Sequence, residues 1–148
     1  MAIEMGQEAP DFTLVDEQNN KVTLSELRGQ PVVLVFYPFD FSPPCTTEHC
    51  DLRDNYTSWM DQGAKVFGVS RDSRFTHAAF KEKENLPYSL LADMKGEAAQ
   101  KFGVWNEQVG CAERATFVID RDGKVAYAIH NGIPDIRDHA EVEAHLAR

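Results

Sequence analysis

One short segment constrains this chain more than any other: an apolar strand that leads directly into a helix carrying a cysteine in its first turn. Residues 32–36 read Val-Val-Leu-Val-Phe, a run rich in β-branched side chains that is typical of a buried parallel strand. Ser42 followed by Pro43 then predicts a helix start, because a hydroxyl can cap free amides and proline loses nothing at the first helical position. Cys45 falls at the third position of that helix.

This position favours a reactive cysteine. Unpaired backbone N–H groups and the positive end of the helix dipole both stabilise a thiolate, and the thiolate is the nucleophilic form. The alternative is a half-buried structural cysteine, since free cysteines are commonly buried. We favour the reactive interpretation of Cys45 because the strand, Ser42 and Pro43 all agree with it.

The rest of the chain predicts one domain of residues 1–148 with a three-layer α/β fold. We expect the cysteine helix to bury Leu52, Tyr56 and Trp59 on one face, and Ser73 to cap a helix that turns Phe80 toward the sheet together with Ala78 and Ala79. The Asp122-Gly123 step predicts a hairpin. The expected elements are an N-terminal β-hairpin (12–15 and 22–24), a helical turn (25–28), strands 32–37, 65–69, 89–91, 116–120 and 125–129, and helices 43–62, 73–84, 96–102 and 138–147.

Charge and composition exclude several classes of partner. The formal net charge is −9 and the isoelectric point is about 4.9, so nucleic acid and anionic membranes would be repelled. The sequence shows no charged-then-apolar leader and no apolar run near the length of about 20 residues that spans a membrane. We therefore expect a cytoplasmic protein whose thiols stay reduced and whose oxidation is transient, which makes a disulfide scaffold improbable.

The cysteine segment resembles the peroxiredoxin signature of a proline, three residues, threonine or serine, two residues and a cysteine, here Pro38, Ser42 and Cys45. The resemblance covers nearly the whole chain. It includes segments 6–12, 66–70 and 112–120, while segments 102–108 and 135–138 are most similar to the alkyl hydroperoxide reductase E type. Cys50 departs from that type and resembles the bacterioferritin-comigratory or Q type. The resemblance implies a thioredoxin-like fold with a central mixed sheet, and a peroxidase that needs no cofactor and reduces hydrogen peroxide and organic hydroperoxides through a sulfenic acid on Cys45.

The same resemblance assigns roles to four neighbours of Cys45. It nominates Arg114 as the cation that lowers the thiol pKa and orients the peroxide, although the residues alone slightly favour a surface arginine. Ser42 would donate to sulfur or peroxide in addition to capping the helix, and Pro38 would shield the thiol from water, although each also has a purely structural explanation. Glu48 would support the hydrogen bonds of the site, but glutamate is favoured in a first helical turn anyway.

Cys50 raises a geometric question that is independent of family. Residues five apart on an ideal helix have Cα atoms about 8 to 9 Å apart, whereas a disulfide needs less than about 7 Å. A Cys45–Cys50 bond therefore requires the first turns to unwind, which costs little at a helix end. We hypothesise that Cys50 resolves the sulfenic acid in this way and that a thioredoxin-like, mycoredoxin-like or low-molecular-weight thiol reduces the product. The alternatives are that Cys50 is idle, and that Cys111 is a second resolving thiol or, more simply, a bystander.

Other chemistries fit the cysteines less well. His49 lies four residues after Cys45, so a catalytic pair is conceivable, but no third group orients the imidazole and we expect it to be solvated. Zinc binding by Cys45, His49 and Cys50 fails on spacing, so we assign no metal. The remaining histidines, which carry no motif, are His77, His130, His139 and His145.

Two other functions remain as alternatives to a peroxidase. A thiol-disulfide oxidoreductase would need a Cys-x-x-Cys pair, which the sequence lacks. A redox-sensing or chaperone-like binding protein would expose Tyr56 and Trp59 when oxidation of Cys45 melts the helix. The reductase E resemblance implies a homodimer packed through loops near Cys45 and Trp105, whereas the Q-type resemblance implies a monomer.

Overall fold

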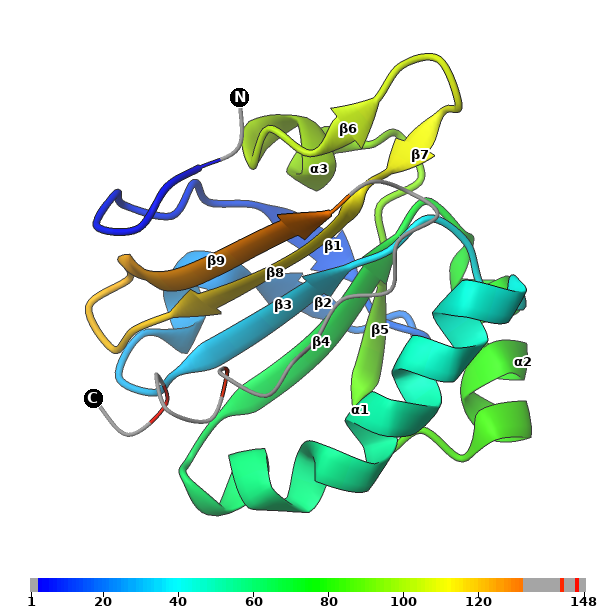
Figure 1. The fold of residues 1–148 in the computed structure, drawn as a ribbon, viewed down its shortest axis with the longest axis horizontal. Coiled ribbons are helices and arrows are strands. Elements are labelled where there is room, and N and C mark those ends of the chain that lie inside the picture. The colour runs from blue at the N-terminus through cyan, green and yellow to red at the C-terminus, as the bar shows by residue number, and fades with distance from the viewer. Residues whose placement is uncertain (1–2, 132–141, 143–145, 147–148) are drawn as a thin grey trace.

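The structure, a computed structural model, describes residues 3–131 together with Val142 and Leu146. Its centre is a sheet of seven strands in the order β2-β1-β5-β4-β3-β8-β9 (Figure 1). Strands β3, β4 and β5 run parallel, whereas β8 and β9 are added antiparallel at one side and the β1–β2 hairpin at the other. The strands are β1 (Thr13–Val15), β2 (Lys21–Thr23), β3 (Val32–Phe36), β4 (Lys65–Ser70), β5 (Ser89–Ala92), β8 (Arg114–Ile119) and β9 (Val125–Asn131).

Helices cover both faces of this sheet. In Figure 1, α1 (Pro43–Asp61) and α2 (Arg74–Glu84) lie on one side, and α3 (Glu97–Lys101) lies on the other beside the small hairpin of β6 (Trp105–Asn106) and β7 (Cys111–Ala112). A 3-10 turn, η1 (Leu24–Leu27), leads into β3. The three-layer α/β fold with a mixed sheet and an N-terminal hairpin is therefore confirmed.

The central strand β3 shows why its sequence has no polar residue. All five of its side chains are buried. Leu34 and Phe36 pack in one apolar cluster with residues of α3, whereas Val33 and Val35 pack in a second cluster with Leu52 and Trp59 of α1. Because successive side chains of a strand point to opposite faces, a strand covered on both faces needs apolar residues at every position.

Several details differ from expectation. The prediction for α2 was wrong at two positions: Ala78 and Ala79 are exposed, and His77 accompanies Phe80 in the interior. The β6–β7 hairpin was not predicted, and β8 begins two residues earlier than expected, at Arg114. Most of the helix expected over 138–147 lies outside the described residues, although Val142 and Leu146 are helical and buried.

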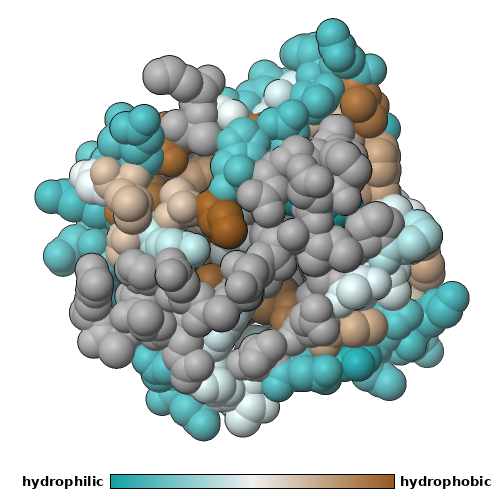
Figure 2. Space-filling model, viewed as in Figure 1, coloured by the Kyte–Doolittle hydropathy of each residue, from teal (hydrophilic) through white to brown (hydrophobic). Residues whose placement is uncertain are grey.

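The described part of the surface is mainly polar. On the face in Figure 2, hydrophilic residues predominate among those coloured by hydropathy, and apolar ones appear in separate places. Within the described residues, no helix combines the length and apolar character needed to cross a membrane.

Candidate active site

The loop from β3 to α1 carries Pro38 and Ser42, two of the predicted site residues, and leads into the helix turn that contains Cys45. Pro38 is buried directly after the strand, and α1 begins at Pro43, so Cys45 is the third helical residue as predicted. The side chains of Cys45 and Glu48 lie outside the described residues, and so do the predictions that concern their contacts. The backbone alone sets Cys45 in the first turn of a 19-residue helix, where amide groups are unpaired.

Ser42 occupies the N-cap position but does not cap the helix with its side chain. Its hydroxyl instead donates to the carbonyl oxygen of Phe39 at 3.1 Å. The expectation that it accepts from a helix amide is therefore wrong. The proline pair that follows explains part of this, because Pro44 has no N–H to offer.

Phe41, directly before Ser42, has an unusual backbone. Its φ of 67° lies in the left-handed region, which is a genuine outlier for a bulky residue and costs about 1 to 3 kcal/mol. Its ring packs edge-on against Phe80 of α2, with centroids 5.0 Å apart. Such strain persists only where the surrounding structure holds the residue in place, and here it lies next to the start of α1.

Arg114 is the first residue of β8 and is only 2% exposed. The structure therefore excludes the surface position that the residues alone had slightly favoured. Strand β8 runs antiparallel to β3 with Ala115 opposite Phe36, so Arg114 is level with Tyr37 at the start of the cysteine loop. A buried guanidinium is costly unless it is paired, and Arg114 is engaged in interactions at this position beside the loop.

Cys50 lies on the same continuous helix as Cys45. A disulfide between them would therefore require the start of this helix to unwind. Cys50 is partly exposed, and its thiol donates to Oε2 of Glu84 at 3.9 Å. Arg53 contacts the same residue, because its Nη1 donates a hydrogen bond to the backbone carbonyl oxygen of Glu84 at 2.6 Å. Burial raises the pKa of the Cys50 thiol, Arg53 opposes the rise and Glu84 adds to it. In the folded helix Cys50 is therefore held mainly as the thiol.

Cys111 lies in strand β7, opposite Asn106, and is fully buried. A thiol without solvent exposure in a paired strand favours the bystander interpretation over a second resolving role.

His49 contradicts its prediction. Rather than being solvated, it is 1% exposed, and its Nδ1 shares a hydrogen bond with the hydroxyl of Tyr88. Its ring also packs edge-on against Tyr37, with centroids 4.2 Å apart. The imidazole thus belongs to the interface between α1 and the sheet.

A buried polar network under the cysteine loop was missed by the sequence analysis. Asp40 of the loop accepts a hydrogen bond from the Tyr37 hydroxyl at 2.5 Å, and its Oδ2 lies 2.7 Å from Nδ1 of His77 on α2. Nε2 of His77 faces the carbonyl oxygen of Leu91 at 3.0 Å and must donate to it. Burial raises the pKa of the Asp40 carboxyl, although the contact with His77 opposes the rise. Burial, with Asp40 adding to it, also raises the pKa of Tyr37.

Asp72 ties the network to the turn after β4. It accepts from the backbone N–H of Asp40 at 2.8 Å and from the Ser70 hydroxyl at 2.5 Å. Asp40, Asp72 and His77 also form a cluster whose potential metal-ligand atoms lie within 4.8 Å of one another. Oδ2 of Asp40 and Nδ1 of His77 share a hydrogen bond at 2.7 Å, and Oδ2 of Asp72 accepts from the Asp40 backbone and from the Ser70 hydroxyl. The cluster is a hydrogen-bonded anchor for the loop.

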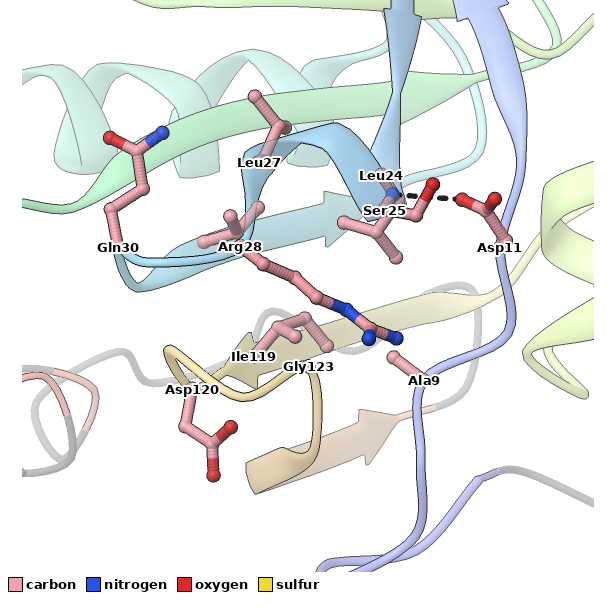
Figure 3. A pocket seen from close by; sticks show the side chains of 11 residues that line it. Ala9, Asp11, Leu24, Ser25, Leu27, Arg28, Gln30, Ile119, Asp120 and Gly123 are labelled. Atoms are coloured by element: carbon pink, nitrogen blue, oxygen red, sulfur yellow. Dashed lines mark hydrogen bonds between the residues drawn. The ribbon is translucent and has the colours of Figure 1, made fainter.

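A separate pocket lies at the other end of β8, where Ile119 and the β8–β9 turn meet η1 (Figure 3). Arg28 extends across it toward Gly123, and Asp11 accepts from the backbone of Ser25 at 2.9 Å. Its volume of about 20 Å³ holds no more than a water molecule. It therefore takes no part in the candidate active site.

Comparisons with known proteins agree with this arrangement. Residues 5–128 match the AhpC/TSA family. The chain is 45% identical to peroxiredoxin Bcp of Bacillus subtilis over 132 residues, which covers 84% of this chain and 83% of the relative. It is 40% identical to the chloroplastic peroxiredoxin Q of Suaeda salsa over 130 residues, covering 87% of this chain and 61% of that longer relative.

Solved structures give the same answer for the fold. The crystal structure of peroxidoxin BcpB from Mycobacterium tuberculosis superposes with a TM-score of 0.88 at 35% identity, covering 97% of this chain and 96% of the other. The crystal structure of Enterococcus faecalis AhpC superposes with a TM-score of 0.89 at 30% identity, covering 99% and 91%. The chain therefore belongs to the AhpC/TSA family and is a peroxiredoxin, a thiol-dependent hydroperoxide reductase with a thioredoxin-like fold.

Proposed function

We propose that Cys45 is the peroxidatic residue and that Cys50 resolves its oxidised form. The observation that carries this proposal is that Cys45 lies in the first turn of α1 while the buried Arg114 lies beside the loop that precedes this turn. Both the free amides of the helix start and a nearby guanidinium lower the pKa of a thiol.

In the first step the Cys45 thiolate attacks the terminal oxygen of a hydroperoxide. The sulfur–oxygen bond forms as the oxygen–oxygen bond breaks, and the departing oxygen takes up a proton to become water or an alcohol. Sulfur is oxidised to a sulfenic acid and the peroxide is reduced. Negative charge moves from sulfur to the departing oxygen, so donors fixed near both oxygens stabilise the transition state.

The chain offers two donors for that charge. Arg114 supplies a permanent cation. The Ser42 hydroxyl, which donates to Phe39 in this structure, would turn toward the peroxide when the substrate binds. Pro38 is buried and has no N–H. It can therefore shield the Cys45 thiol from water without donating a hydrogen bond to the sulfur. Glu48 keeps a proposed supporting role in this hydrogen-bond network.

In the second step the Cys50 thiolate attacks the sulfenic sulfur of Cys45. The sulfur–sulfur bond forms as the sulfur–oxygen bond breaks, and the departing hydroxide takes up the proton that Cys50 gave up and becomes water. Because both residues lie on one helix, α1 must unwind at its start before the sulfurs meet. A dithiol or low-molecular-weight thiol then reduces the disulfide through a mixed disulfide and returns both thiols. Thioredoxin-like and mycoredoxin-like proteins are the proposed reductants, and the cytoplasm is the proposed compartment.

A homodimer through the loops near Cys45 and Trp105 also remains part of the proposal. Two large apolar side chains are exposed there: Phe41 is 44% exposed in the cysteine loop, and Val109 is 51% exposed in the β6–β7 hairpin. Sedimentation of the reduced and oxidised protein tests this assembly.

Turnover with a generic dithiol tests the function. Wild-type protein should consume hydrogen peroxide catalytically, Cys45→Ser should abolish consumption, and Cys111→Ser should leave it unchanged. Peptide mass spectrometry after one equivalent of peroxide should show a Cys45–Cys50 disulfide, and Cys50→Ser should show a persistent sulfenic acid on Cys45. A wild-type protein that retains the sulfenic acid without this disulfide would reject the resolving role. Stoichiometric oxidation without turnover would favour the redox sensor instead.

A further inference from the structure

The segment that must unwind contains a residue fixed deep in the protein. This argument builds on the proposed resolving role of Cys50. Among the described side chains between the two cysteines, Thr46 is partly exposed and Thr47 is exposed, whereas His49 is 1% exposed. His49 is therefore the described contact that joins this part of α1 to the body of the molecule.

The pocket around His49 is built from several elements. Phe80 of α2 packs edge-on against the imidazole at a centroid distance of 5.4 Å, and the rings of Tyr37 and Tyr88 lie at 4.2 and 5.7 Å. Gly68 of β4 completes the pocket, because a Cβ added there would lie 3.2 Å from Cε1 of His49. The Tyr88 hydroxyl holds the imidazole by a hydrogen bond to Nδ1.

Unwinding residues 45–50 rotates and translates each residue between the cysteines. His49 must then leave its pocket, lose three ring contacts and break its bond to Tyr88. The buried hydrogen bond and the aromatic contacts each stabilise the helical form of the segment. These contacts are present only while the segment is helical, so they oppose disulfide formation selectively.

We propose that His49 is a positioning residue that keeps the segment from Cys45 to Cys50 helical, and that its contact with Tyr88 controls how fast the Cys45 sulfenic acid is resolved. The sulfenic acid has two fates. It condenses with the Cys50 thiol to a disulfide and water, or a second peroxide oxidises it to a sulfinic acid and leaves as water or an alcohol. A slower opening of the helix directs more protein into the second fate.

The test uses one variant that removes the hydrogen bond between Tyr88 and His49 and one that removes the His49 side chain from its pocket. Tyr88→Phe keeps the ring and loses the hydroxyl, and His49→Ala removes bond and packing together. Thr47→Ala, on the exposed side of the same segment, is the local control. Val104→Ala is the control for global stability, because Val104 is fully buried in the cluster that contains no described residue of α1.

The protein is mixed rapidly with peroxide and its tryptophan fluorescence, from Trp59 and Trp105, is followed. Oxidation of Cys45 depends on the peroxide concentration, whereas formation of the disulfide does not, so the two phases are separated. Tyr88→Phe should accelerate the second phase by roughly fivefold to tenfold, and His49→Ala by at least as much. Both variants should form less sulfinic acid at high peroxide, and both controls should match wild type. An unchanged or slower second phase in both variants would overturn the inference.

Hydrogen–deuterium exchange distinguishes this inference from the resolving role on which it rests. In reduced protein, both variants should speed exchange at the amides of residues 45–52 beyond any change in Val104→Ala. Faster exchange without any Cys45–Cys50 disulfide in wild type would reject the resolving role and the rate control together. A wild-type disulfide with unchanged exchange in both variants would reject His49 alone. If His49→Ala does not fold, the result for Tyr88→Phe alone decides between these outcomes.

Discussion

Oδ2 of Asp40 lies 2.7 Å from Nδ1 of His77, and both side chains are completely shielded from solvent. The pair connects the loop that leads into the cysteine helix with α2, two segments that are 37 residues apart at this contact. Because Asp40 also accepts from Tyr37, one carboxyl group organises the strand end, the loop and the second helix beneath the candidate active site.

Substitutions at Asp40 should show how much this carboxyl stabilises the fold. Asp40→Ala leaves buried groups of Tyr37 and His77 without their common partner, and each buried polar group left unsatisfied costs about 1 to 3 kcal/mol. Asp40→Asn should cost much less, because its amide oxygen can still accept from Tyr37 and its NH₂ can donate to Nδ1 of His77. Urea unfolding measures both values. Equal losses in the two variants would show that the hydrogen bonds are not what stabilises the loop.

The same carboxyl should make stability depend on pH. Burial raises the pKa of Asp40 in the folded protein, so between its ordinary and raised values the folded state retains a proton that the unfolded state has lost. Its contribution to the free energy of unfolding is therefore complete at low pH and declines as pH rises through the raised pKa. Unfolding of wild type and Asp40→Asn across pH 4 to 8 checks the sign. The advantage of wild type over Asn should shrink as pH rises, and a growing advantage would contradict the assignment.

Loss of the buried Arg114 should lower kcat/KM for peroxide reduction far more than loss of the exposed Arg121. Arg114→Gln removes the buried cation beside the cysteine loop, and kcat/KM for hydrogen peroxide should fall roughly 100-fold. Arg121→Gln is the matched control, since Arg121 is exposed at the β8–β9 turn and donates to the carbonyl of Gly29. Similar small losses of kcat/KM in both variants would show that Arg114 does not stabilise the transition state.

Glu84 should control the acidity of Cys50. Burial raises the pKa of this thiol and the Glu84 carboxylate adds to the rise, so Glu84→Gln should lower the pKa and increase the thiolate fraction at a given pH. Alkylation of Cys50 by iodoacetamide at pH 8, in a Cys45→Ser background, should therefore be faster in the variant. Glu82→Gln, exposed on the same helix, serves for comparison. Equal alkylation rates at pH 8 in Glu84→Gln and Glu82→Gln would show that Glu84 does not act on the thiol.

Gly68 should be intolerant of a side chain. A Cβ at this position would lie 2.7 Å from Cδ2 of Leu90 and 3.2 Å from both His49 and Tyr37. Gly68→Ala should lower the free energy of unfolding by about 1 to 3 kcal/mol, the usual cost of overpacking. Gly63→Ala tests the left-handed backbone instead, because that glycine has a φ of 83° and open space around it. A melting temperature unchanged in Gly68→Ala would show that the pocket of His49 can expand.

Local signals made most of the fold predictable. The apolar run of β3, the Ser42-Pro43 helix start and the Asp122-Gly123 turn each act over a few residues, and the structure has β3, α1 and the β8–β9 hairpin where they indicate. Ser73 likewise accepts from the backbone of Thr76 at 3.2 Å, as its capping role predicts. These elements depend on neighbours in the chain, which a single sequence contains.

The site was predictable only in part. His49, Leu52, Tyr56 and Trp59 recur at spacings of three and four residues, so the inward face of α1 extends back to His49. The prediction failed because a polar side chain was assumed to prefer water. For the pair of Asp40 and His77 the sequence offers no comparable pattern, since the two positions meet only after α2 packs on the sheet.

The backbone of Phe41 has a consequence for the reaction cycle. A non-glycine residue with a φ of 67° is held in a conformation that it would leave if the loop were released. Rearrangement of residues 41–50 on oxidation would let this torsion relax, returning about 1 to 3 kcal/mol toward the cost of opening the helix. If Cys50 resolves Cys45 as proposed, this strain brings the reduced protein closer in energy to the rearranged state than the close packing around its cysteine helix suggests.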